Sequence, residues 1–158
     1  MSIARPKLFI GSSSQAYDRG IPNVFRDHLS EYADVYIWKS VREFQTRNST
    51  MEALYAVANE YDFGLFILSE DDLLIMPSNS GEYCAPRDNV VLELGLFSGA
   101  LGSDRTFCVV ESPTGEKKMR VPTDLDGRTM PRIDTTNDDL LRSSVCLLYT
   151  SPSPRDRG

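Results

Sequence analysis

The run Phe63–Leu68 constrains the fold of this chain more than any other segment. Its residues, Phe-Gly-Leu-Phe-Ile-Leu, carry no polar side chain, and a strand that is apolar on both sides is typical of a parallel sheet covered on both faces. Parallel strands need crossover connections, which are usually helices. The segment therefore predicts an α/β domain in which a sheet lies between two layers of helices.

The rest of the chain alternates between strand and helix patterns. Strands are predicted at residues 7–10, 35–38, 63–68 and 106–110, with a short edge strand at 119–121. Helices are predicted at 15–32, 49–58 and 87–101, and Pro22 is tolerated only near the start of the first. Residues 69–87 are predicted to form a long polar loop. The predicted fold class is thus a three-layer α/β domain with a mostly parallel sheet of four to five strands.

Composition excludes several classes of protein. A net charge of −6 argues against a nucleic-acid partner, since phosphate binding needs a basic surface. No stretch approaches the roughly 20 apolar residues of a membrane span. The three cysteines show no metal-binding spacing, and their sparse, odd number suits a reducing compartment. We therefore expect a cytoplasmic domain with no metal site and no membrane segment in this chain.

The C-terminal residues look foreign to the domain. Residues 146–156 match the translation of a sequencing adapter, and a Ser/Pro-rich linker to a further domain is the alternative. The pattern from Asn137 onward resembles a helix that has just begun. We therefore predict a domain at 6–145 with a truncated C-terminal helix, followed by an artefact at 146–158.

One charged residue interrupts the apolar helix predicted at 87–101. Val90, Leu94 and Phe97 form a stripe at helical spacing, and Glu93 lies beside it. An ionised carboxylate is costly to bury unless it is paired. Glu93 either reaches solvent at the helix edge or faces a ligand beyond the carboxyl ends of the strands, where parallel sheets bind ligands.

Several segments recur, in this order, in a known family. They are residues 9–14, 35–38, 62–63, 71–72, 86–97, 101–102 and 122–127. In them the chain resembles the bacterial TIR-like domains that serve as effectors of cyclic-nucleotide-triggered antiphage systems, including TIR-STING fusions. The resemblance covers about residues 6 to 134 and implies the flavodoxin-like TIR fold.

The resemblance also implies an activity, the hydrolysis of NAD at the bond between nicotinamide and ribose. The family's helix glutamate falls on Glu93, which would stabilise the positive charge of the transition state. NAD is then the substrate and no cofactor is expected. The family further implies activation by self-association of TIR domains and a sensor domain for cyclic nucleotides. We expect residues 1–145 alone to turn over NAD poorly.

Residues near the first two strand ends are candidates for binding substrate. Gly11, Ser12 and Ser13 resemble a family loop whose N–H groups and hydroxyls could hold a phosphate or ribose, although a plain tight turn is an alternative. Trp38 and Phe44 flank the second loop and could stack on the nicotinamide or adenine ring. A core position is an equal alternative for Trp38.

The start of the Glu93 helix supplies two more candidates, Arg87 and Asn89. Arg87 could bind a phosphate or Glu93, and a structural ion pair with Asp88 or Glu82 is the alternative. The neighbouring carboxylates Asp71 and Asp72 are weak evidence for a metal and are better interpreted as shaping their loop. The single histidine, His28, is expected to be structural.

Two alternative functions remain open at this stage. One is a non-catalytic TIR module that binds partners through like-to-like contacts, with Glu93 structural. The other is an N-glycosidase of the nucleoside deoxyribosyltransferase kind, which shares a related sheet and a glutamate. Release of nicotinamide from NAD distinguishes the hydrolase from both.

Overall fold

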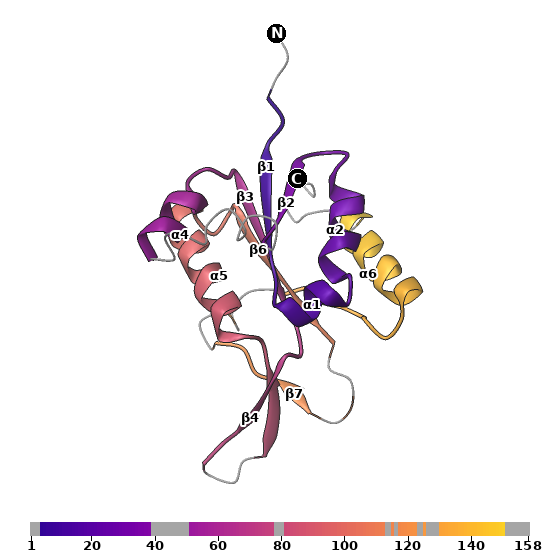
Figure 1. Ribbon diagram of the computed structural model, residues 1–158. Coiled ribbons are helices and arrows are strands. Elements are labelled where there is room, and N and C mark those ends of the chain that lie inside the picture. The colour runs from indigo at the N-terminus through magenta and orange to yellow at the C-terminus, as the bar shows by residue number, and fades with distance from the viewer. Residues whose placement is uncertain are drawn as a thin grey trace, which may run out of the picture.

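The computed structural model describes residues 4–38, 51–77, 81–112, 115, 117–122, 125 and 130–150. Its centre is a parallel sheet of five strands in the order β2-β1-β3-β6-β8 (Figure 1). The strands are β1 (Lys7–Gly11), β2 (Asp34–Ile37), β3 (Phe63–Leu68), β6 (Thr106–Glu111) and β8 (Arg132–Ile133). The apolar run became β3 in the middle of the sheet, buried at every residue after the first, which confirms the predicted fold class.

Helices cover both faces of the sheet. The first layer holds α1 (Ser14–Asp18), α2 (Ile21–Leu29) and α6 (Asp138–Thr150), and the second holds α4 (Met51–Ala58) and α5 (Asp88–Leu101) (Figure 1). Because neighbouring residues of a strand point to opposite faces, Ile10 packs in the core under α2 whereas Phe9 packs in the core under α5. No helix in the described ranges combines the length and apolar character that crossing a membrane requires.

The helix predicted at 15–32 is in fact two helices. The chain breaks at Gly20, whose φ of 78° lies in the left-handed region that favours glycine. Pro22 then falls in the first turn of α2, where its missing N–H costs nothing. The prediction of one continuous helix was therefore wrong, and the break sets α1 apart as a short element behind the β1 loop.

The polar loop predicted at 69–87 was also wrong, because it contains a β-hairpin. Strands β4 (Asp72–Ile75) and β5 (Glu82–Ala85) pair antiparallel, and β7 (Lys118–Met119) adds to β5 in parallel. The edge strand predicted at 119–121 thus joins this small sheet, and β8 takes the edge of the main sheet instead. The small sheet projects from the main sheet beyond the start of α5 (Figure 1).

Helix α6 begins where the sequence indicated. The Asn137 side chain accepts a hydrogen bond from the Leu140 N–H at 2.9 Å, which satisfies a free donor of the first turn. Leu141 and Val145 are buried in the core that α6 shares with α2. The helix runs past residue 145 to Thr150. The origin of residues 146–158 and the truncation of the last helix stay predictions.

Candidate active site

A polar cavity of about 340 Å³ opens at the carboxyl edge of the sheet. Its lining comes from the loop after β1, the start of α1, the residue after β2, and the N-cap and first turns of α5: Ser12, Ser13, Ser14, Gln15, Trp38, Arg87, Asn89, Val90 and Glu93. Six of the eight predicted site residues are in this set. Of the other two, Gly11 lies directly before the lining, and Phe44 lies outside the described residues.

Glu93 faces the cavity from the second turn of α5. The residue is 7 % exposed, and its Oε1 accepts a hydrogen bond from Nε1 of Trp38 at 3.0 Å. The predicted alternative of a helix edge that reaches solvent does not fit this burial. A carboxylate out of water interacts more strongly with a nearby positive charge than an exposed one does. Glu93 therefore lies at the cavity where the sequence expected a ligand, and its catalytic role stays a prediction.

Packing along α5 explains why Glu93 points this way. Val90, Leu94 and Phe97 form the predicted stripe and are all buried against the sheet. The ring of Phe97 stacks on that of Phe9 with centroids 4.7 Å apart. Since Glu93 precedes Leu94 by about 100° around the helix, anchoring the stripe directs Glu93 toward the cavity.

The three predicted residues of the β1 loop have different surroundings. Ser13 Oγ accepts the Ala16 N–H at 3.1 Å as the N-cap of α1 and donates to Asp71 Oδ1 at 2.6 Å. Ser12 Oγ donates to the Ser13 carbonyl at 3.2 Å, and its oxygen can still accept a hydrogen bond from a ligand in the cavity. Packing explains the glycine at position 11, because a Cβ there would lie 2.5 Å from the Phe66 ring.

Trp38 and Arg87 combine structural contacts with a place in the lining. The half-buried Trp38 ring packs against the core under α5 and also lines the cavity. The two positions that the sequence offered for Trp38, in the core or at the site, are therefore not exclusive. Arg87 pairs through Nη2 with Asp72 at 3.3 Å, whereas the sequence had suggested Asp88 or Glu82. Its Nε is buried and has no hydrogen-bond partner in the described part of the chain. An acceptor on a bound ligand could satisfy that N–H.

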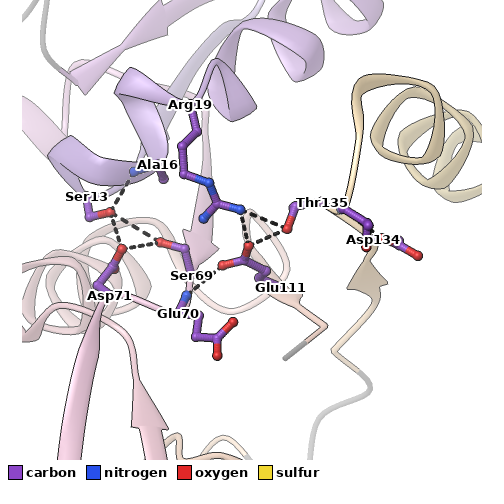
Figure 2. Close-up of polar contacts among 10 residues, drawn as sticks. Ser13, Ala16, Arg19, Ser69, Glu70, Asp71, Glu111, Asp134 and Thr135 are labelled. Atoms are coloured by element: carbon purple, nitrogen blue, oxygen red, sulfur yellow. Dashed lines mark hydrogen bonds and ion pairs between the residues drawn. The ribbon is translucent and has the colours of Figure 1, made fainter. Parts of the chain in front are cut away.

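Asp71 makes more contacts beside the cavity than the sequence alone indicated. Its carboxylate contacts the hydroxyls of Ser13 and Ser69 on one side (Figure 2). On the other side it accepts the backbone N–H of Arg87 at 3.1 Å. The prediction that this carboxylate shapes its loop agrees with these contacts. Among the described residues, three or more His, Cys, Asp or Glu side chains do not come together in a group that could hold a metal ion.

A second buried carboxylate, Glu111, lies at the end of β6 next to the same loops. It accepts hydrogen bonds from Arg19 at 2.5 Å, from the Glu70 N–H at 2.7 Å and from the Thr135 hydroxyl (Figure 2). Burial alone would raise the pKa of Glu111, but these donors outweigh it and lower the pKa below its ordinary value. The hydrogen bond between Arg19 and Glu111 also raises the pKa of the Arg19 guanidinium. The cluster fixes α1 to the carboxyl edge of the sheet.

The five-stranded parallel sheet, the helices on both faces and the glutamate-bearing cavity at the carboxyl edge fit the predicted TIR fold. Residues 7–135 match the family model of the CAP12/Pycsar effector protein TIR domain, and the chain belongs to that family. This confirms the predicted resemblance.

Relatives of the chain carry two kinds of name. CD-NTase-associated protein 12 of Flavobacterium daejeonense is 33 % identical over 132 residues, which are 84 % of this chain and 39 % of that protein. The protein of the same name from a Lachnospiraceae bacterium is 33 % identical over 131 residues, 83 % of this chain and 38 % of the relative. Pycsar effector protein BcPycTIR of Burkholderia cepacia is 31 % identical over 134 residues, or 84 % and 42 %. The chain thus spans about two fifths of the length of these relatives.

Proposed function

We propose that this domain hydrolyses NAD at the bond between nicotinamide and ribose. The observation that carries the proposal is Glu93, a carboxylate that is 7 % exposed, lines the cavity and accepts a hydrogen bond from Trp38. Membership of a TIR effector family supports the same activity. NAD is the substrate, and the proposed reaction needs no cofactor.

The chemistry suits a site built around one carboxylate. The bond from the nicotinamide nitrogen to ribose C1′ breaks, its electron pair leaves with the ring, and nicotinamide departs as a neutral molecule. Because the leaving group needs no proton, no strong general acid is required. Water adds to C1′ and loses one proton, giving ADP-ribose. Glu93 stabilises the oxocarbenium-like transition state and hydrogen-bonds the ribose hydroxyls.

Other lining residues bind the substrate in this proposal. Ser12 and Asn89 offer a hydroxyl and an amide to the ribose, and the buried Nε of Arg87 donates to a phosphate oxygen. The Trp38 ring stacks on a planar base while its N–H holds Glu93. Phe44 keeps its predicted stacking role.

Assembly completes the site in this proposal. The cavity of about 340 Å³ is near the lower end of the range for ligand pockets, so it suits the reacting half of NAD better than the whole dinucleotide. A neighbouring TIR domain would cover the remainder, which makes turnover depend on self-association. The relatives' names, CD-NTase-associated protein and Pycsar effector, support a cyclic-nucleotide signal as the trigger of an antiphage response. The same proposal places that response in the cytoplasm.

Nicotinamide release tests the proposal. The chain is assayed with NAD alone and when fused to a scaffold that forces oligomers, beside Glu93→Gln and the exposed control Glu60→Gln. Glutamine keeps the size of Glu93 and can still accept the Trp38 N–H, so the variant removes mainly the charge. We expect assembly-dependent release that Glu93→Gln lowers by about 10²- to 10³-fold, as for loss of other transition-state contacts.

Each alternative has its own result in this assay. No release by the assembled protein would refute the hydrolase and favour a non-catalytic interaction module. Release of a free base from nucleosides but not from NAD would favour a deoxyribosyltransferase-like enzyme. Equal release by the native protein and Glu93→Gln would refute the assignment of Glu93 alone.

A further inference from the structure

We infer that Asp71 is the positioning residue that sets the spacing between the two walls of the cavity, an inference that rests on the proposed hydrolysis of NAD. One wall is the loop after β1, which carries Ser12. The other is the first part of α5, which carries Glu93. Asp71 is absent from the cavity lining, so it acts through its neighbours and does not touch the substrate.

The contacts of Asp71 join three separate segments. Oδ1 accepts the Ser13 hydroxyl at 2.6 Å and the Ser69 hydroxyl at 2.8 Å, which ties the β1 loop to the end of β3 (Figure 2). Oδ2 accepts the Arg87 N–H at 3.1 Å, directly before α5 begins. The Asp71 N–H contacts the Ala85 carbonyl at 3.2 Å, at the end of β5. One side chain therefore fixes the distance between the walls.

A carboxylate is the side chain that these contacts require. Ser13 Oγ already accepts the Ala16 N–H, so its own proton is free for Asp71. The Ser69 hydroxyl also donates, and the Arg87 N–H is a backbone donor that cannot rotate away. Three donors thus converge on one acceptor group. Asparagine offers one acceptor oxygen and brings two donors of its own, so it cannot satisfy all three.

Asp62, in the same chain, supplies a matched control. Asp62 also accepts a backbone N–H that links two strands, that of Lys7 at 2.8 Å. It lies directly before β3, at the amino edge of the sheet and away from the cavity. Asp62→Asn therefore makes the same carboxylate-to-amide change at a side chain that joins two strands, without touching either wall. Any general cost of losing a strand-joining carboxylate appears in both variants, whereas a displaced cavity wall appears in one.

The test combines kinetics with hydrogen exchange on the full chain in its assembled form. We expect Asp71→Asn to lower kcat about 10- to 100-fold, because a small misplacement of a reacting group has effects of this size, and Asp62→Asn to stay within about twofold. Ser13→Ala should lower kcat less, and its effect should be less than additive with that of Asp71→Asn, because both substitutions disturb the hydrogen bonds made by one side chain. The Arg87 amide should exchange faster in Asp71→Asn than in Asp62→Asn.

The outcomes separate this inference from the proposed function. Unchanged exchange at Arg87 in Asp71→Asn, an unchanged kcat in an active protein, or additive effects with Ser13→Ala would each overturn the positioning role. If Asp71→Asn does not fold, Ser13→Ala and Ser69→Ala each remove one of its contacts, and an unchanged kcat in both would overturn it. A native protein that is inactive when assembled refutes the hydrolase, and Arg87 exchange then still reports whether Asp71 holds the walls.

Discussion

Replacing Glu111 with glutamine should destabilise the domain by about 2–4 kcal/mol at neutral pH. Glu111 is fully buried and accepts hydrogen bonds from Arg19, Thr135 and the Glu70 N–H. Breaking a buried ion pair costs about 3–5 kcal/mol, but the Arg19 side chain is 42 % exposed and can be hydrated once its partner is lost. Glutamine also keeps one acceptor oxygen, so the expected cost of about 2–4 kcal/mol is lower than that of breaking a fully buried pair.

The loss should depend on pH in a definite direction. The folded-state pKa of Glu111 is lowered from the ordinary value of 4.5, so its contribution is complete above that value and disappears as pH falls through the lower, folded-state pKa. Glutamine does not titrate. The stability difference between the native chain and Glu111→Gln should therefore be constant near neutrality and shrink in acid.

Urea unfolding at about pH 7 and about pH 3 measures this difference. The exposed Glu60→Gln serves as the control, for which we expect a change within about 0.5 kcal/mol at either pH. A Glu111→Gln difference that is equally large at both pH values would refute the reasoning, because the lost stability would then not come from an ionised carboxylate. A difference below about 0.5 kcal/mol at neutral pH would refute it as well.

Two further substitutions test particular contacts. Gly11→Ala places a Cβ 2.5 Å from the Phe66 ring and should cost about 1–3 kcal/mol through overpacking; thermal unfolding measures this, and an unchanged melting temperature would contradict the close packing. Trp38→Phe removes the 3.0 Å hydrogen bond to Glu93 and should lower kcat for nicotinamide release about 10-fold or more, given that hydrogen bonds to charged groups contribute about 1.5–3 kcal/mol. Unchanged turnover would show that Glu93 does not depend on this bond.

Strong local patterns predicted the main architecture. An apolar run such as β3 (Phe63–Leu68) fits few environments other than the middle of a covered sheet. The apolar stripe of α5 likewise determines which side of that helix is buried, and with it the direction of Glu93. These elements depend on patterns within a few neighbouring residues, so the sequence was sufficient.

Elements that depend on distant partners were missed. Strands β4 and β7 have four and two residues, and each is stabilised by pairing that no short pattern encodes. The adjacent Asp71 and Asp72 look equivalent in sequence, yet the hairpin turns one toward Ser13 and the other toward the Arg87 guanidinium. Glu111 and its partner Arg19 are 92 residues apart, so no local sequence pattern could predict that they form an ion pair.

Nicotinamide release from NAD by the assembled protein shows whether the Glu93 carboxylate enables cleavage of NAD. The native protein, Glu60→Gln and Glu93→Gln are compared at equal folded concentration and saturating NAD. We expect release by the first two and a loss of about 10²- to 10³-fold in Glu93→Gln. Release that is equal in all three, or absent from the assembled native protein, would contradict it.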